Sequence, residues 1–161
     1  MEYKQGVITR IDGKVCLIHN EENIYRGYIP NKIQGIERNT SKPLCVGDHV
    51  HFIETNNEVM IKQVEPRRTR LSRKTSGPVK REQIVVSNVD QMLIVTSVDS
   101  PAFHPGIIDR FLVAGLKGKL TPLACLNKID LASQTKDLEK IYTAIEVYQK
   151  LGYTIIATST A

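Results

Sequence analysis

The hydrophobic pattern of the chain changes partway along, and this change limits the possible folds more than any other feature. In residues 1–66 the apolar residues form short runs separated by turn signals, and Asp12-Gly13 and Asn56-Asn57 are typical hairpin turns. From residue 84 onwards, longer apolar runs alternate with segments whose apolar residues recur at helical spacing. The sequence therefore predicts two domains of different class, residues 1–66 and 84–161, joined by a linker at residues 67–83.

The first region contains five short apolar stretches, at residues 6–11, 14–19, 24–29, 48–53 and 58–64. Strands of this length and spacing predict a small closed barrel, and five strands are the number that an OB-fold requires. An SH3-like or other small barrel without a role in nucleic-acid binding is the alternative interpretation.

The second region predicts an α/β domain with a parallel sheet. Residues 91–98 are almost continuously apolar, as expected of a strand that is buried on both faces of such a sheet. Further strands are predicted at residues 121–126 and 153–157, and helices at residues 106–117 and 136–151. Strands that alternate with helices imply right-handed parallel crossovers.

The positive charge of the chain is concentrated in the linker. The net charge is +5 with a pI near 9.1, and residues 66–81 contain seven basic residues and no acidic one. This basic strip is either a solvated, flexible linker or a surface that tracks nucleic-acid phosphates, since Lys and Arg gain affinity by releasing counterions. The candidate RNA-binding residues are Arg67, Arg68, Arg70, Arg73 and Lys74.

The cysteine pattern and the apolar runs bear on cellular location. Cys16, Cys45 and Cys125 lie far apart without metal-ligand spacing, so we interpret them as small buried hydrophobes in a reducing cytoplasm. The apolar runs are too short to cross a bilayer, and the first residues lack the apolar core of a signal peptide. We expect a cytoplasmic monomer without a membrane partner, and we assign no catalytic residue and no metal ligand.

The candidate binding motif is Asn127-Lys128-Ile129-Asp130, at the end of the second predicted parallel strand. Ligands bind outside the carboxyl ends of such strands. A carboxylate at Asp130 can accept hydrogen bonds from the ring N–H and the exocyclic amine of guanine, a donor pair that adenine lacks. The Asn127 amide can hold the loop and reach the base, and the aliphatic stem of Lys128 can cover the ring. The alternative interpretation is an ordinary polar turn.

The third predicted strand ends in Thr158-Ser159-Thr160-Ala161. Because the carboxyl ends of parallel strands meet at one edge of a sheet, this segment is expected beside the Asn127 motif. Ser159 is the candidate contact to guanine there.

The order of several motifs resembles one known family, the circularly permuted GTPases of bacteria that depend on the small ribosomal subunit. The resemblance covers essentially all 161 residues. The motifs that carry it are Val46-Gly47-Asp48, Glu65-Pro66-Arg67-Arg68 with Leu71 and Arg73, Ser87-Asn88-Val89-Asp90-Gln91, Ile108-Asp109-Arg110-Phe111-Leu112, Leu126-Asn127-Lys128-Ile129-Asp130-Leu131 and Leu151-Gly152-Tyr153.

The resemblance implies a mixed fold, with an N-terminal OB-fold β-barrel followed by a partial, circularly permuted G domain of the P-loop GTPase type. It implies that the barrel contacts 16S rRNA, that the domain binds GTP and GDP, and that hydrolysis is stimulated by the small (30S) subunit during its late maturation. It also implies Mg²⁺ and a zinc-binding tail.

The chain departs from this family in its phosphate-binding parts. It contains no Gly-x-x-x-x-Gly-Lys-Ser/Thr segment, no Asp-x-x-Gly segment for Mg²⁺ and no Cys/His cluster for zinc. Phosphoryl transfer depends on those positioning groups, so we expect no GTP hydrolysis by this chain alone, and we interpret it as a truncated product or half of a split gene. The alternatives are a non-enzymatic RNA-binding OB-fold protein with a remnant G-domain half, and an unrelated small barrel fused to an α/β interaction module.

Overall fold

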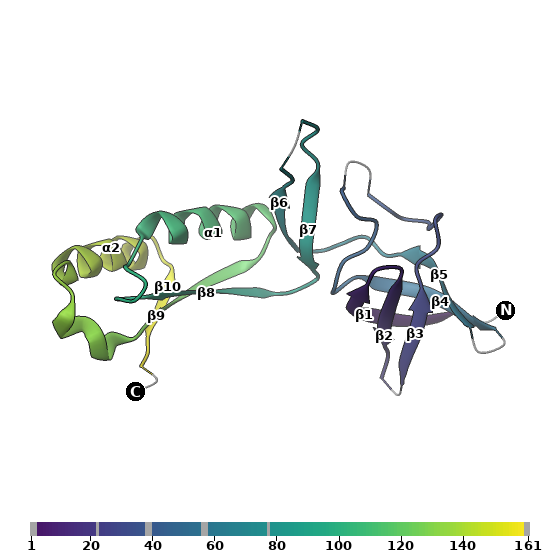
Figure 1. Ribbon diagram of the computed structural model, residues 1–161, viewed down its shortest axis with the longest axis horizontal. Coiled ribbons are helices and arrows are strands. Elements are labelled where there is room, and N and C mark those ends of the chain that lie inside the picture. The colour runs from purple at the N-terminus through teal and green to yellow at the C-terminus, as the bar shows by residue number, and fades with distance from the viewer. Residues whose placement is uncertain (1–2, 22, 38–39, 56–57, 77, 160–161) are drawn as a thin grey trace. The chain divides into compact units, whose positions relative to one another are not determined.

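The computed structural model describes residues 3–21, 23–37, 40–55, 58–76 and 78–159. The chain divides into two compact units, Met1–Val89 and Asp90–Ala161. Figure 1 shows that the first is built mainly from strands, whereas the second combines strands with helices. The predicted fold class, a five-stranded barrel followed by a partial α/β region, is confirmed.

The barrel is formed by β1 (Lys4–Asp12), β2 (Val15–His19), β3 (Ile24–Tyr28), β4 (His49–Thr55) and β5 (Glu58–Val64). Their order is β1-β2-β3-β5-β4, and β4 pairs back onto β1. The pairs are antiparallel except β3 with β5, which is the OB-fold arrangement. Gly13 has a φ of 62° in the predicted β1–β2 turn, a conformation that glycine adopts readily. The second predicted turn, Asn56-Asn57, lies outside the described residues.

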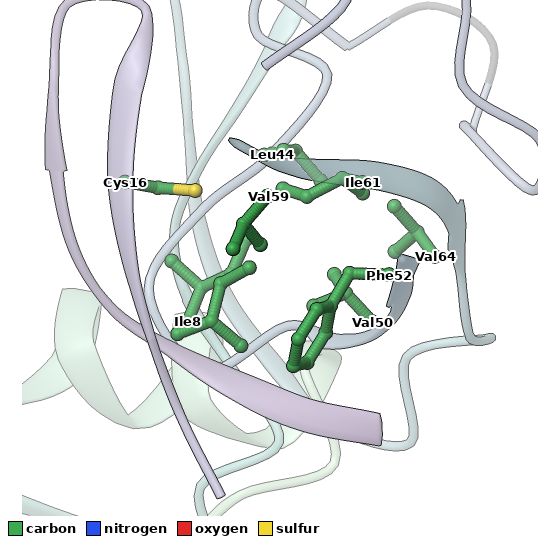
Figure 2. Close-up of a cluster of buried hydrophobic side chains, with 9 residues drawn as sticks. Ile8, Cys16, Leu44, Val50, Phe52, Val59, Ile61 and Val64 are labelled. Atoms are coloured by element: carbon green, nitrogen blue, oxygen red, sulfur yellow. The ribbon is translucent and has the colours of Figure 1, made fainter. Parts of the chain in front are cut away.

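The barrel core follows from the alternation of inward and outward side chains along its strands, which register shifts in the β1–β2 and β4–β5 pairs interrupt. Val50 and Phe52 of β4 point inward, as do Val59 and Ile61 of β5 (Figure 2). Each such side chain contributes about 1.5–3 kcal/mol when it is removed from water. The remaining members of the buried cluster are Ile8, Cys16, Ile18, Leu44 and Val64.

The predicted linker at residues 67–83 differs most from its expected form. Most of it belongs to a hairpin of β6 (Arg70–Lys74) and β7 (Glu82–Ser87), two antiparallel strands inside the first unit. β7 includes Ile84, which the sequence analysis had placed in the α/β half. The hairpin is stabilised by the burial of Ile84 and by a hydrogen bond that Ser72 Oγ donates to Glu82 at 2.6 Å. The Glu82 carboxylate also lies 3.6 Å from Arg70 Nε, which offsets part of the positive charge.

The hairpin is attached to the barrel by the segment of residues 40–47. The Ser41 amide donates to the Glu82 carbonyl at 2.9 Å, and the Ser87 amide donates to the Val46 carbonyl at 3.0 Å. Gly47 has a φ of 90°, and a Cβ at this position would overlap the carbonyl oxygen of Ser87. Glycine is therefore required for β7 to pass so close to the barrel.

The second unit contains a parallel sheet of β8 (Gln91–Ser97), β9 (Thr121–Asn127) and β10 (Thr154–Ala157), in the order β10-β9-β8. The crossovers contain α1 (Pro105–Lys117) and α2 (Leu138–Lys150), and a short 3₁₀ helix, η1 (Ile129–Gln134), follows β9. Two right-handed crossovers that step in the same direction place both helices on one face of the sheet, as Figure 1 shows.

The helices bury one face of this sheet. Ile108 and Leu112 of α1 are buried, and Ile141 and Ile145 of α2 pack with Leu126 of β9. Among the described residues the opposite face is open, with Leu93, Val95 and Ile156 each about half exposed. The expectation that residues 91–98 are buried on both faces is therefore wrong within the described part of the chain, because helices cover a single face.

No helix in the described part of the chain has the length and apolar character needed to cross a membrane.

Candidate functional site

The Asn127-Lys128-Ile129-Asp130 motif lies where β9 ends and η1 begins. Lys128 has a φ of 59°, so the chain turns sharply directly after Asn127. The Asn127 side-chain oxygen accepts the Lys128 amide at 2.8 Å, which closes this turn. Asp130 is exposed in the first turn of η1, and Ile129 is partly exposed beside it.

The loop after β10 is tied to this motif by hydrogen bonds. Thr158 Oγ1 donates to Asn127 Oδ1 at 3.1 Å, and the Ile129 amide donates to the Thr158 carbonyl at 3.2 Å. Thr158 Oγ1 also lies 3.1 Å from Cys125 Sγ. Thr158 is a site residue that the sequence pattern did not predict, although its position at the end of a parallel strand was a usable signal.

Ser159 and Asp130 meet across the two loops. Ser159 Oγ donates to Asp130 Oδ1 at 2.5 Å. Lys128 Nζ donates to the Ser100 carbonyl, in the loop after β8. The structure thus brings Asn127, Asp130 and Ser159 together at the carboxyl edge of the sheet, where a partly buried amide adjoins an exposed carboxylate and an exposed hydroxyl.

The predicted RNA-binding residues fall into a buried group and an accessible group, and the buried group consists of Arg67. Its side chain is 3% exposed. Its Nε donates to Asp48 Oδ1 at 2.7 Å, and a terminal nitrogen donates to Asp48 Oδ2 at 2.8 Å. A guanidinium that is buried and paired in this way is unavailable to a phosphate, so we assign Arg67 to the fold.

Asp48 is the centre of a buried polar cluster. Ser87 Oγ donates to it at 2.6 Å and the Cys45 amide at 2.9 Å, in addition to the two bonds from Arg67. Burial alone would raise the pKa of Asp48, but the hydrogen bonds from Arg67, Ser87 and the Cys45 amide outweigh it and hold the pKa below its ordinary value. The cluster joins the barrel, the strip and β7.

The other basic residues of the strip are more accessible. Arg68, Arg73 and Lys74 are exposed. Arg73 Nε donates to the Gln83 side chain at 3.0 Å, which leaves its terminal nitrogens for a ligand. Arg70 is partly exposed and pairs with Glu37 at 2.6 Å, so part of its charge is neutralised.

Among the described residues, no group of three or more His, Cys, Asp or Glu side chains is arranged to hold a metal ion. The three cysteines are buried and free. Burial raises the pKa of both Cys16 and Cys45 to about 11, which keeps these thiols protonated at neutral pH.

Known proteins are similar to this chain in sequence and in fold. The sequence model of the family described as RsgA GTPase matches residues 64–161. A protein of Chlorobaculum tepidum named small ribosomal subunit biogenesis GTPase RsgA is 31% identical over 169 residues, covering 98% of this chain and 52% of that protein. A protein of the same name from Alkaliphilus metalliredigens is 34% identical over 131 residues, covering 80% of this chain and 40% of that protein.

Two solved structures are similar as well. One is YloQ, described as a circularly permuted GTPase, with a TM-score of 0.67 and 25% identity over 99% of this chain and 52% of that one. The other is YjeQ from Thermotoga maritima, with a TM-score of 0.66 and 28% identity over 98% of this chain and 52% of that one. The chain spans about half the length of these relatives.

The fold and the matched segment define a protein of the circularly permuted GTPase class. The chain belongs to the RsgA GTPase family.

Proposed function

We propose that this chain is the RNA-contacting and guanine-recognising portion of a cytoplasmic GTPase that acts in biogenesis of the small (30S) ribosomal subunit. The observation that carries the proposal is the meeting of Asn127, Asp130 and Ser159 at the carboxyl edge of the sheet, in a chain that belongs to the RsgA GTPase family. The division of labour follows the two units, with Met1–Val89 for RNA, including the exposed basic residues of the β6–β7 hairpin for phosphates, and Asp90–Ala161 for guanine.

The guanine chemistry rests on Asp130. A carboxylate has two oxygens with several lone pairs, so Asp130 can accept the N1–H and the amine of guanine while Ser159 remains bonded. In this proposal the backbone at Ser159 contacts the guanine oxygen, and Lys128 and Ile129 supply aliphatic surface for the ring face. Asn127 acts as a positioning residue, because its side-chain oxygen is already engaged by the Lys128 amide and Thr158.

The residues present fit the base of GTP or GDP but not its phosphates. Most of a nucleotide's affinity comes from backbone N–H groups, a Lys and Mg²⁺ gathered around the phosphates. The 161 residues contain no P-loop motif and no Asp-x-x-Gly segment, and the described residues show no ligand set for Mg²⁺ or zinc. We therefore expect very weak nucleotide binding and no GTP turnover by this chain, with or without small subunits.

RNA binding is assigned to the barrel and the hairpin. OB-folds bind oligonucleotides with strands 2 and 3 and the adjoining loops. Arg68, Arg73 and Lys74 provide exposed cations next to the barrel, and 16S rRNA in late subunit maturation is the proposed target. A non-enzymatic RNA-binding protein is the second candidate, and it is favoured by the exposed cations together with the lack of a P-loop motif in these 161 residues.

Nucleoside titrations test the base-recognition half of the proposal. Because phosphates contribute nothing here, guanosine and adenosine at millimolar concentration are the right probes, read by amide shifts in ¹⁵N spectra. Guanosine should shift the amides of Asp130 and Ser159, adenosine should not, and Asp130→Ala should abolish the response. Asp137→Ala removes an exposed aspartate of the same unit and should leave it intact.

The two candidate functions predict different results in these experiments. Equal shifts with guanosine and adenosine would refute base recognition and leave the RNA-binding protein as the better account. Phosphate release from GTP by the purified 161-residue chain would refute the expected lack of turnover.

A further inference from the structure

A cleft of about 780 Å³ lies within the first unit, between the barrel and the β6–β7 hairpin. The barrel side contributes Ile11, Ile29 and Pro30, the hairpin side contributes Gln83 and Val85, and residues 42–46 run between them. This volume is within the range of about 300–1,000 Å³ that is typical of small-molecule sites. The guanine-recognition residues belong to the other unit, so this cleft is a separate feature.

In the described part of the chain, the charged residues that line the cleft are all basic. Lys14, Lys42 and Arg73 line it, and no Asp or Glu is among the described lining residues. Lys14 and Lys42 are exposed and have no ion-pair partner in the described part of the chain. An apolar surface bordered by unpaired cations suits a ligand with a flat apolar part and a neighbouring negative charge, which is the chemistry of a nucleotide.

The polar groups of the cleft suit a nucleobase. The Gln83 side-chain oxygen accepts Arg73 Nε at 3.0 Å, which orients the guanidinium plane and turns the Gln83 amine toward other partners. Asn31 adds a second amide side chain. Unpaired RNA bases are commonly recognised by stacking on guanidinium planes and by hydrogen bonds to their edges, whereas paired bases are stacked inside the duplex.

The walls are held in place by backbone hydrogen bonds. The Ile29 amide donates to the Lys14 carbonyl at 2.9 Å, which fixes the barrel side. The Ser87 amide donates to the Val46 carbonyl at 3.0 Å, which fixes the hairpin side. A preformed cleft of this kind loses little conformational entropy when it binds a ligand.

We propose that this cleft takes an unpaired nucleotide of the RNA that the first unit binds. The base lies against Pro30 and Val85, and the flanking phosphates lie near Lys14, Lys42 and Arg73. The inference rests on the proposed RNA-binding function and adds to it, because a strip of cations alone does not distinguish paired from unpaired RNA.

The experiment uses the full chain and two labelled RNA hairpins that differ by one unpaired 2-aminopurine. The chain should bind the bulged hairpin about tenfold more tightly than the fully paired one, since only the unpaired base can leave the helical stack and bury its face against the apolar surface of the cleft. Val85→Glu places a carboxylate in the cleft and should remove this preference, and Lys42→Ala should reduce it. Val79→Glu makes the same change at an exposed valine of the same hairpin, outside the cleft, and should retain it.

The outcomes distinguish this inference from the function on which it rests. Equal binding of both hairpins, with affinity that still falls when Arg68 and Lys74 are replaced, would overturn the cleft and leave the RNA-binding function standing. No binding of either hairpin would overturn both. If Val85→Glu and Val79→Glu lost the preference for the bulged hairpin equally, the cause would be the added negative charge and not the cleft. That result would overturn the inference. A Val85→Glu defect on small subunits but not on protein-free RNA would assign the cleft to a protein segment, which also overturns the inference.

Discussion

Asp48 in the first unit and Asp130 in the second are the same residue type in opposite circumstances. Asp48 is fully buried and accepts five hydrogen bonds, from two nitrogens of Arg67, from Ser87 and from the amide and the thiol of Cys45. Asp130 is exposed and accepts a hydrogen bond from Ser159, which lies on a neighbouring loop. The first carboxylate is saturated by the protein, whereas the second retains capacity for a ligand.

The same contrast separates the basic residues of the strip. Arg67 is withdrawn into the fold by Asp48, while Arg68, Arg73 and Lys74 face solvent. Charged groups that are buried and paired hold segments together, and those that remain open can bind. Saturation of hydrogen-bonding capacity, rather than residue type, therefore distinguishes structural from functional charges in this chain.

Substitution of Asp48, whose hydrogen-bonding capacity is filled by the protein, should produce the largest change in stability. Asp48→Asn removes the carboxylate that makes both close hydrogen bonds to the buried Arg67 guanidinium, and it leaves the more distant Glu37, at 3.6 Å, as the counter-charge. We therefore expect the first unit to lose about 3–5 kcal/mol of unfolding free energy. Urea unfolding followed by barrel amide signals measures this loss. Asp12→Asn is the matched control, because Asp12 pairs with Arg10 on the surface and should cost less than about 1 kcal/mol. Equal losses in the two variants would contradict a structural role for the buried pair.

A fall in pH should gradually remove the stability that Asp48 contributes. The pKa of Asp48 is lower in the folded state than its ordinary value of 3.8, so its contribution to stability is present above that value. The contribution is lost as the pH falls through the lowered folded-state pKa. Urea midpoints of the first unit should therefore drop in this acidic range, and Asp48→Asn should flatten the drop. An unchanged pH profile in the variant would assign the acid sensitivity to other groups.

The exposure of each side chain to solvent predicts which residues of the basic strip contact RNA. Replacing Arg68, Arg73 and Lys74 together with Ala should leave the fold intact and reduce the slope of log K against log salt by up to about 3. Arg67→Ala should instead lower the stability of the first unit. Filter binding at several salt concentrations, with urea unfolding of each variant, checks both statements. A triple variant with the parent salt slope would show that these residues do not contact phosphates.

Sequence patterns predicted the features that depend on local periodicity. Alternation at Val50 and Phe52 marked a barrel strand, and helical spacing at Ile108 and Leu112 marked a helix on the parallel sheet. The Asn127 motif could be placed at a strand end because strand order dictates which edge carries ligands.

The features that were missed depend on contacts between distant residues. Arg67 lies 19 positions from Asp48, and nothing local distinguishes it from Arg68. The hairpin was hidden because a run of cations is typical of a linker, whereas pairing with Glu82 stabilises a strand. Asp109 had no evident partner in the sequence, yet Tyr148 donates to it at 2.8 Å from the other helix.

The most direct test of the central claim changes the hydrogen-bonding pattern of Asp130 without changing its size. In Asp130→Asn the side-chain amine can donate to the 2-oxo group of xanthine while the oxygen accepts N1–H, so the pattern no longer matches guanine. Because Asp130 is exposed, unfolding free energy should change by less than about 0.5 kcal/mol. Titrations of both chains with guanosine and xanthosine should show guanosine preferred by the parent and xanthosine by the variant. An Asp130→Asn chain that still prefers guanosine would contradict the assignment of Asp130 as the guanine-reading residue.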